Sequence, residues 1–363
     1  MSLFKGKVIE AEIFGGSREK SVGVKINGLS GFSFDEIELN AFLARRKPSD
    51  RFFSTERKES DKPVFSGGLS GGKIDGELVC EIFNEDAKNT EKSRYLGIPR
   101  PSHADYVRYI TSGETNFSGG GEFSGRMTAP YSVLGGICKQ ILEKSFGVKI
   151  RAYLTRVGGA AGDGYYNRDI NKIFNDKEYV FCEKNGFPSL SDADEMLGET
   201  EKAKLSGDSV GAAIECVVKN APAGLGGSLF GGLEGKIAYL AYAIPAVKGV
   251  EFGLGSKLSE SFGSEANDGM RYDENGKVIF LTNNSGGIDG GISNGNDIVF
   301  RAALKPAPTI SKPQKTVDLI NKQNVEVSFC GRNDACVGVR AVPVVESAAA
   351  IAILDEILSK SAK

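Results

Sequence analysis

The 363-residue chain has 45 Lys and Arg residues against 47 Asp and Glu residues, which gives a formal net charge of -2. This balance excludes the strongly basic footprint of a general nucleic-acid binder, so any anion must be bound by a local cluster of basic side chains. Apolar residues at 40% and charged residues at 25% are typical of a globular protein with a packed core. Apolar stretches such as residues 237–247 are far shorter than the roughly 20 residues that span a bilayer, so we expect no membrane contact.

Histidine and cysteine restrict the chemistry that the chain can perform. His103 is the only histidine, so a reaction that needs an imidazole near neutral pH has one candidate, and a multi-histidine metal site has little to work with. The six cysteines form no CxxC pair, so we expect no metal site. The N-terminus MSLFKGKVIEAEIF lacks the features of a secretory signal peptide. We therefore expect a cytoplasmic protein whose cysteines are reduced and mostly buried.

The N-terminal region predicts a hairpin followed by a helix. Two β-rich runs, residues 8–13 and 22–26, flank a glycine-rich turn at residues 15–17. Apolar residues at helical spacing then predict a helix over residues 37–43. This helix should end where a basic run begins, before Pro48.

The rest of the chain predicts an alternation of helices and strands. The clearest helix spans residues 133–148 after Pro130, because its apolar residues recur at i, i+3 and i+4, and we expect it to be buried against a sheet. The other predicted elements are a helix at 189–206 capped by Ser189 and Ser191, a buried helix at 344–360 after Pro343, and strands at 150–156, 211–219 and 297–304. Because no linker or repeat divides the chain, we expect residues 1–363 to form one α+β domain.

Basic residues concentrate after the first predicted helix, where the sequence contains Arg45, Arg46, Lys47, Arg51, Arg57 and Lys58. This run fits a solvated face, since acidic residues are interleaved with it. It fits equally a site for a multiply charged anion, because arginine offers paired donors to phosphate and carboxylate groups. Further arginines in similar polar, glycine-bounded contexts are Arg100, Arg126 and Arg332.

His103 and the glycine runs each have two interpretations. A single histidine is most often structural. His103, however, lies between rigid prolines and Asp105 and follows Arg100, so a catalytic role and a structural role are equally compatible with the sequence. The glycine runs at 119–121 and 286–295 fit tight turns or a backbone that binds phosphate. Neither has the strand-GxGxxG-helix context of a dinucleotide-binding motif.

In chain order, these segments resemble one family, chorismate synthase, from about residue 4 to residue 357. The stretches that carry the resemblance are ARRKPSDRFFSTERKESD, RPSHADY, GGGEFSGRMTAP, GDSVGA with PAGLG, AVKGVEFG, GGIDGGISNG leading into ALKPAPTI, and GRNDACVGVRAVPVVE. The resemblance implies a β-α-β sandwich with helices between antiparallel sheets, assembled as a homotetramer. It also implies the anti-1,4-elimination of phosphate from 5-enolpyruvylshikimate 3-phosphate to give chorismate. That reaction requires reduced FMN without net redox change, and NADPH is a candidate reductant.

The resemblance assigns site residues by matching positions. The family's catalytic positions fall on His103, Asp334, Ser17 and Arg18, with His103 as the residue that protonates the reduced flavin and Asp334 near flavin N5. Its substrate-binding arginines fall on Arg46, Arg51, Arg100, Arg126 and Arg332. Its FMN contacts fall on Ser124, Ala246, Gly290, Lys305, Pro306, Ala307, Pro308, Thr309 and Arg332.

Four positions depart from the family pattern. The family's FGESHG is Phe14 to Glu19 here, so Arg18 replaces a second catalytic histidine that assists the departing phosphate. Glu122 stands where GGGRSS has its arginine, Asn333 replaces the histidine of GRHDP, and Pro245 replaces an asparagine. Arg18 could stabilise the leaving phosphate electrostatically without donating a proton. The same substitutions also fit a flavin-binding relative with another phosphorylated substrate, or a non-catalytic binding or assembly protein.

Overall fold

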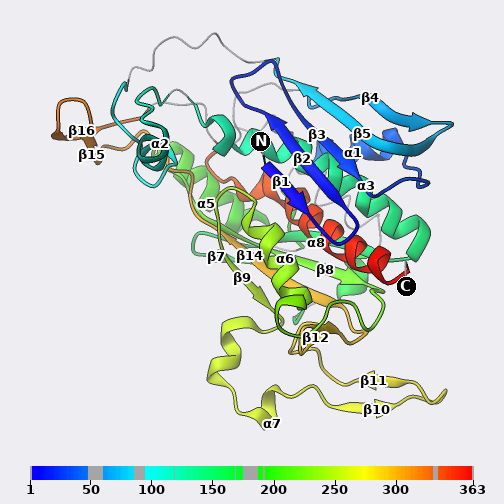
Figure 1. Ribbon diagram of the computed structural model, residues 1–363. Coiled ribbons are helices and arrows are strands. Elements are labelled where there is room, and N and C mark those ends of the chain that lie inside the picture. Colours follow the sequence, from blue (N-terminus) through cyan, green and yellow to red (C-terminus); the bar gives the residue numbers. More distant parts are fainter. Residues whose placement is uncertain are drawn as a thin grey trace.

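Two five-stranded antiparallel sheets form the outer layers of the fold, in a computed structural model of the chain (Figure 1). The first sheet has the order β1-β2-β3-β5-β4, and the second has the order β7-β6-β8-β14-β9. The strands of the first sheet are β1 Ser2–Lys5, β2 Glu10–Gly15, β3 Ser21–Asn27, β4 Pro63–Ser70 and β5 Lys73–Phe83. Those of the second are β6 Lys149–Val157, β7 Ala160–Ala161, β8 Ala212–Lys219, β9 Val247–Phe252 and β14 Ile298–Leu304. The structure describes residues 2–47, 60–85, 95–117, 119–167, 169–174, 187–190, 193–329 and 334–361.

Two long helices, α3 (Thr128–Phe146) and α8 (Gly338–Ser361), lie between the sheets and pack on each other (Figure 1). Helix α3 contacts β3 and β5 of the first sheet, and α8 contacts β6 and β8 of the second. The predicted α+β sandwich with helices between antiparallel sheets is therefore confirmed. Its interior is one continuous cluster of buried side chains drawn from both sheets and both helices.

Shorter elements surround this sandwich. The other described helices are α1 Glu36–Ala44, α2 Asp105–Ser112, α5 Ala193–Leu205, α6 Leu233–Tyr242 and α7 Gly263–Ala266. Short 3₁₀ helices lie at Gly121–Phe123, Gly125–Met127, Ile170–Phe174, Leu229–Gly231 and Gly255–Glu260. Three hairpins pair β10 Met270–Tyr272 with β11 Val278–Phe280, β12 Ile288–Asp289 with β13 Ile292–Ser293, and β15 Gln314–Asp318 with β16 Gln323–Val327. In the part of the chain that the structure describes, no helix is both long and apolar enough to span a bilayer.

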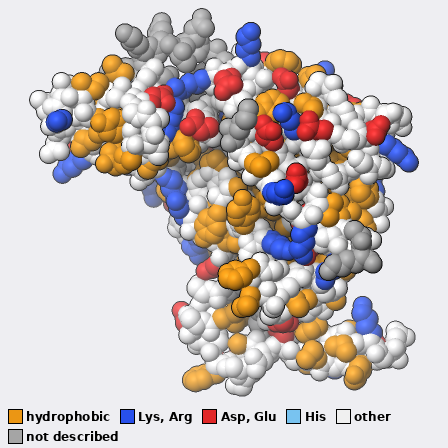
Figure 2. All heavy atoms as spheres, viewed as in Figure 1, with side chains coloured by type: hydrophobic (Ala, Val, Ile, Leu, Met, Phe, Trp, Pro, Cys, Tyr) orange, Lys and Arg blue, Asp and Glu red, His pale blue; other side chains and the backbone are white. Residues whose placement is uncertain are grey.

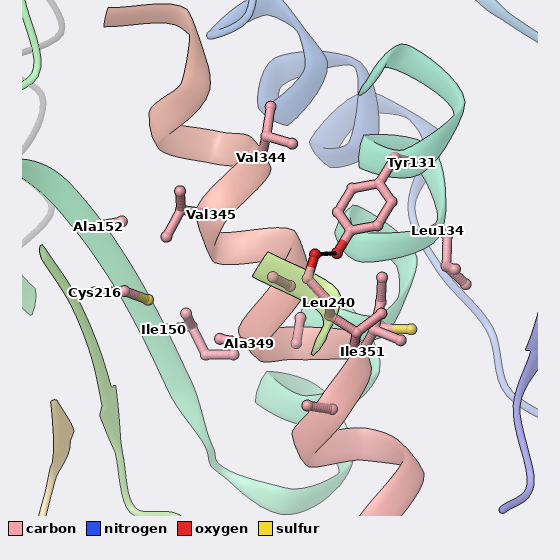
Figure 3. Close-up of a cluster of buried hydrophobic side chains, with 14 of the residues drawn as sticks. Tyr131, Leu134, Ile150, Ala152, Cys216, Leu240, Val344, Val345, Ala349 and Ile351 are labelled. Atoms are coloured by element: carbon pink, nitrogen blue, oxygen red, sulfur yellow. Dashed lines mark hydrogen bonds between the residues drawn. The ribbon is translucent and has the colours of Figure 1, made fainter. Parts of the chain in front are cut away.

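The contact between α3 and α8 is unusually close at one glycine. A Cβ built on Gly135 would lie 2.0 Å from the Cβ of Ser347, so any larger residue would push the helices apart. Apolar side chains of α3, α8 and the second sheet pack together in the core (Figure 3), where the Tyr131 hydroxyl also donates a hydrogen bond of 3.0 Å to the Leu240 carbonyl of α6. Helix α8 is buried on nearly all sides, so its apolar and small residues are not confined to one stripe, and the acids Glu346, Asp355 and Glu356 are buried among them.

A buried charged cluster ties the C-terminal end of α1 to the two central helices. The Glu346 carboxylate of α8 is fully buried and accepts two hydrogen bonds from Arg45, at 2.8 and 2.9 Å, and one from Lys139 of α3. Burial would raise the pKa of Glu346, but Arg45 and Lys139 outweigh burial and hold that pKa well below its usual range. This pairing directs Arg45 into the sandwich.

Most of the predicted elements are present, with two corrections. The helix predicted after Pro343 begins earlier, at Gly338, because a proline in the first turns removes only one backbone donor. Ser189 does not cap α5, which begins at Ala193; it forms an isolated bridge with Leu154 instead. The second predicted cap, Ser191, lies outside the described residues.

The ends of α3 also differ from the prediction by a few residues. The helix begins at Thr128, so Pro130 lies in its first turn, where no backbone donor is needed. It ends at Phe146 because Gly147 adopts a left-handed conformation, and the amide of Val148 then turns back to the Leu142 carbonyl.

The cysteines that the structure describes are all buried and free. They are Cys80, Cys138, Cys216 and Cys336. Burial raises the pKa of the Cys336 thiol to about 11, so that side chain stays protonated and unreactive at neutral pH. The expectation of reduced core thiols is met at these positions, and the remaining two, Cys182 and Cys330, lie outside the described residues.

Candidate active site

His103 is held by a buried carboxylate at the N-terminus of α2. Its Nδ1 lies 2.7 Å from Asp105 Oδ1, and the same carboxylate accepts hydrogen bonds from Arg100 Nε at 2.7 Å and Nη2 at 2.8 Å. Burial would raise the pKa of Asp105, but the hydrogen bonds from Arg100 and His103 hold it well below its usual range. Asp105 therefore stays ionised and fixes the direction of the imidazole, which leaves Nε2 as the ring nitrogen that can exchange a proton.

Arg18 lies in the β2–β3 turn and reaches the loop that contains the glycine run. The hairpin predicted at residues 15–17 is present, and its turn carries Ser17 and Arg18. Arg18 Nη2 donates to the Gly119 carbonyl at 3.4 Å, and Arg100 Nη2 donates to the same carbonyl at 2.9 Å. The position that replaces the family histidine and the His103 cluster therefore meet at Gly119.

A second carboxylate, Glu114, joins Arg18 to Arg108 of α2. Arg18 Nη1 donates to Glu114 at 3.3 Å, and Arg108 Nη2 donates to the other oxygen of that carboxylate. Glu122 forms an ion pair with Arg108, with 3.7 Å between Nε and Oε1. Glu122, the acid at the position of a family arginine, is thus paired with Arg108 of α2.

A third carboxylate, Asp61, binds two of the predicted substrate-binding arginines. It accepts hydrogen bonds from Arg46 Nη1, at 2.8 Å, and from Arg126 Nη1, and it is almost completely buried. Burial alone would raise the pKa of Asp61, but the two guanidinium groups lower it below its ordinary value. Burial lowers the pKa of Arg46 to about 10, which leaves it charged at neutral pH. Thr128 accepts a further hydrogen bond of 2.7 Å from Arg46 Nη2.

Asn84 links the Asp61 cluster to the turn that carries Arg18. Its side-chain oxygen accepts a hydrogen bond of 2.7 Å from Arg126 Nε. Its amide nitrogen donates to the carbonyls of Gly16 and Glu19, at 3.1 and 2.8 Å. The β2–β3 turn is therefore fixed between the Asp61 cluster and the Gly119 loop.

Asp334 and the segment from Lys305 to Thr309 also adjoin these clusters. Arg340 donates to Asp334 at 2.8 Å and to the backbone carbonyl of Arg46 at 2.7 Å. Arg100 Nη1 lies 3.4 Å from Thr309 Oγ1.

The described cofactor positions other than Gly290 lie in or against these clusters. Lys305 binds the Ser102 carbonyl with its ammonium group, and its backbone amide donates to the Ala246 carbonyl at 2.9 Å. Ser124 caps the turn that holds Arg126, whose amide donates to its hydroxyl at 3.2 Å. Pro306, Ala307 and Pro308 complete the segment, and Ser209 donates to the Ala307 carbonyl at 2.7 Å.

Gly290 is not brought to the clusters. It lies in the β12–β13 turn, in the lower part of the molecule as viewed in Figure 1 and well away from α2. Arg51 and Arg332 lie outside the described residues, as does Asn333, so their predicted roles have no structural description.

Five residues in these clusters were not predicted from the sequence: Asp61, Asn84, Arg108, Glu114 and Arg340. Asp61 closes the motif that contains the basic run, and an acid in that position could have suggested a partner for an arginine. The other four had no local signal, because the contacts that join them to the site cross long stretches of sequence: Arg18 and Glu114 are 96 residues apart, and Arg340 and Arg46 are 294 apart.

Several arginine nitrogens in these clusters are buried without a hydrogen-bond partner among the described residues. They are Arg18 Nε, Arg46 Nε and Arg108 Nη1. A buried donor that lacks an acceptor is costly, so these nitrogens fit a site whose acceptor is supplied by an anionic ligand. A positioned imidazole beside fixed guanidinium groups defines an enzyme site for an anionic substrate.

Known proteins with similar sequences identify the family. A family model described as chorismate synthase matches residues 9–358. Chorismate synthases of Thermococcus gammatolerans and Methanocaldococcus jannaschii are 42% and 37% identical, over 99% and 96% of this chain and 98% and 94% of their own length. That of the bacterium Lachnoclostridium phytofermentans is 37% identical over 98% of this chain and 94% of its own length. The chain belongs to the chorismate synthase family, which makes it a lyase acting on a phosphate-bearing substrate.

A solved structure supports the fold assignment independently. A crystal structure of chorismate synthase, 23% identical in sequence, superimposes with a TM-score of 0.72 and covers 98% of this chain and 93% of that chain. At this identity the match supports the fold rather than the details of the site. The predicted resemblance to the family is confirmed by the sequence relatives.

Proposed function

We propose that this chain converts 5-enolpyruvylshikimate 3-phosphate to chorismate and inorganic phosphate, with reduced FMN as cofactor. In this 1,4-elimination a C–H bond and the C–O bond to phosphate break, and a second ring double bond forms. The observation that carries the proposal is that Arg100 and Arg18 both reach the Gly119 carbonyl while Asp105 joins Arg100 to His103, because a proton-exchanging group and fixed cations then lie within one site.

The residues present fit an anionic cofactor and an anionic substrate. Three buried arginine nitrogens have no acceptor among the described residues, and the phosphate and carboxylate groups of the two ligands would supply one. Lys305 adds a further cation beside Ser102, and Arg100 adjoins Thr309. When bound, reduced FMN supplies electrons that the elimination returns, since the reaction has no net redox change.

His103 moves a proton at Nε2 in this proposal. Asp105 binds Nδ1, which orients the ring and stabilises the imidazolium form when Nε2 accepts a proton. Arg18 stabilises the departing phosphate by charge, because its fixed guanidinium gains a partner as negative charge develops on the leaving group. Asp334, held by Arg340, remains the second acid of the proposed flavin site.

We also propose that the enzyme is cytoplasmic and works as a homotetramer of chains that each form one domain. Support for an assembly comes from large apolar side chains that are exposed around α6, including Leu229, Phe230, Tyr239 and Tyr242, and from exposed Leu3 of the neighbouring strand β1. Figure 2 shows hydrophobic side chains gathered over this part of the surface. Light scattering on the purified protein measures the mass, and a monomeric mass at micromolar concentration would contradict the tetramer.

An anaerobic assay with purified 5-enolpyruvylshikimate 3-phosphate tests the reaction. Chorismate, followed by absorbance, and inorganic phosphate should appear in equal amounts with reduced FMN and not with oxidised FMN. Adding NADPH to oxidised FMN tests whether the chain reduces the flavin itself.

Arg126→Ala should lower kcat/KM by a factor of about 10 or more, because it breaks a buried charge-assisted contact. Arg271→Ala, on the exposed β10–β11 hairpin, is the matched control and should leave the rate unchanged. Failure of the wild-type protein to form chorismate would refute the proposal.

A further inference from the structure

Arg108 has a buried nitrogen that the rest of the described chain does not use. The side chain is more than nine-tenths buried, and Nη1 has no hydrogen-bond acceptor among the described residues. Nη2 donates to Glu114, and Nε faces Glu122. A Cβ on Gly121 would lie 3.6 Å from Nη1 and from Nη2, so the guanidinium group lies directly against the glycine-rich loop.

Arg108 and the His103 cluster lie on the same side of α2. Asp105, which orients His103, precedes Arg108 by three residues, and residues three apart share a helix face. Glu114 connects Arg108 to Arg18, which has a buried unpartnered nitrogen of its own, Nε. The two guanidinium groups therefore flank the Gly119–Gly121 loop, with Arg18 Nε 3.5 Å from where a Cβ on Gly119 would lie.

Glu122 is the loosest partner in this arrangement. Its carboxylate is 3.7 Å from Arg108 Nε, longer than a hydrogen bond, and its side chain is more than half exposed. Glu114 is held by both arginines and is less exposed. A ligand anion could therefore displace Glu122 while Glu114 continues to hold the two arginines in position.

We propose that Arg108, together with Arg18, binds a phosphate monoester group at the Gly119–Gly121 loop, and that Glu122 occupies the place of this anion in the free protein. Phosphate suits the site because its oxygens accept several charge-assisted hydrogen bonds at once, and arginine presents its donors in a fixed fork. The inference rests on the proposed function, since the phosphate is that of FMN or that of the substrate. In this arrangement α2 supplies the positive charge that position 122 lacks.

Ligand binding without turnover tests this proposal and separates the two sources of phosphate. The probes are FMN and riboflavin, titrated by flavin fluorescence, and 5-enolpyruvylshikimate 3-phosphate, titrated by calorimetry in the absence of flavin. Arg108→Ala should weaken binding of the phosphorylated ligand about 10- to 100-fold, the usual effect of removing a hydrogen bond to a charged group. If the phosphate is that of FMN, FMN binding weakens while riboflavin binding does not. If it is that of the substrate, substrate binding weakens and FMN binding is unchanged.

A double substitution separates a direct ligand from a residue that only neutralises Glu122. Arg108→Ala leaves Glu122 without its cation, and the negative charge alone could repel a phosphate. If Arg108 binds the phosphate, Arg108→Ala combined with Glu122→Gln should still bind weakly, and Glu122→Gln alone should bind several-fold more tightly than wild type. Recovery of wild-type affinity in the double variant would overturn the proposal, as would unchanged affinity for all three ligands in Arg108→Ala.

Two further measurements keep the test decisive. Arg108→Lys retains a charge that can pair with Glu114 but loses the forked pair of guanidinium donors, so it should weaken phosphate binding. This variant supplies the test if Arg108→Ala does not fold. Arg271→Ala is the matched control and should bind every ligand as wild type does. Wild-type protein that binds neither FMN nor substrate would refute the proposed function, whereas normal wild-type binding with no effect of Arg108→Lys or Arg108→Ala would refute this inference alone.

Discussion

Removing the negative charge of Glu346 is the most direct test of the buried charged cluster. Its carboxylate receives two hydrogen bonds from Arg45, one from Lys139 and one of 2.9 Å from the Ala152 amide, and it is fully buried. Glu346→Gln would leave both cations facing a neutral amide, and breaking a buried ion pair from one side costs about 3–5 kcal/mol. For a chain of this length, that cost corresponds to a fall in Tm of about 4–7 °C.

Urea unfolding and calorimetry measure this effect. Because the chain has no tryptophan, far-ultraviolet circular dichroism is the suitable probe, at a fixed protein concentration in case the chains associate. Glu38→Gln is the matched control: Glu38 lies 2.8 Å from Lys144, but both side chains are about half exposed. An exposed pair contributes about 0–1 kcal/mol, so the control should be nearly as stable as wild type.

Glu346→Gln should also change how the free energy of unfolding depends on pH. The folded-state pKa of Glu346 lies below its ordinary value of 4.5, so its contribution is fully present above that value and is lost as pH falls through the folded-state pKa. Wild-type stability should therefore fall below about pH 4.5, with each such carboxylate adding up to about 1.4 kcal/mol per pH unit. Glu346→Gln should have a shallower acid slope. A variant within 1 kcal/mol of wild type at pH 7, with an unchanged slope, would show that the cluster is hydrated rather than buried.

Three further predictions concern packing and the site. Gly135→Ala should destabilise the protein by about 1–3 kcal/mol because its Cβ would clash with α8. Gly198→Ala, at an open position on α5, should instead stabilise the protein by up to about 1 kcal/mol. Urea unfolding measures both variants, and equal effects would contradict the close helix contact. His103→Ala should lower turnover by about 10²–10⁴ with an unchanged circular dichroism spectrum, since the chain has no other imidazole, and full activity would refute the proposed proton exchange. Arg18→His should raise the Kd for the substrate without a gain in turnover, and faster turnover would refute Arg18 as a phosphate ligand.

Local sequence patterns predicted the elements of the fold better than the contacts of the site. The hairpin around residues 15–17 and the helix after Pro130 follow from alternation and from helical spacing, which each residue expresses with its neighbours. The predicted boundaries of the helix after Pro130 are in error by a few residues, because Gly147 ends that helix and Pro130 lies inside its first turn. The arrangement of two sheets around two helices came from the family resemblance rather than from these patterns.

The basic run shows where local reasoning stops. Arg45 and Arg46 are adjacent, and the sequence gives no reason to separate them. Because successive residues on a helical turn point in different directions, Arg45 enters the sandwich to Glu346, while Arg46 turns to Asp61 beside the site. Of the two interpretations left open for the run, the solvated face is therefore wrong for both residues, whereas Lys47 is exposed.

Shared carboxylates explain how a chain with a net charge of -2 can build a site for anions. In each cluster of the site a single acid binds two basic side chains: Asp61 binds Arg46 and Arg126, Asp105 binds Arg100 and His103, and Glu114 binds Arg18 and Arg108. The two arginines at Asp61 therefore keep one uncompensated positive charge and are held in fixed directions, whereas the surplus at Glu114 is offset by Glu122 until an anion displaces that side chain. Charges more than about 10 Å away are largely screened by salt, so this local surplus, and not the net charge of the chain, sets the potential that a bound phosphate experiences.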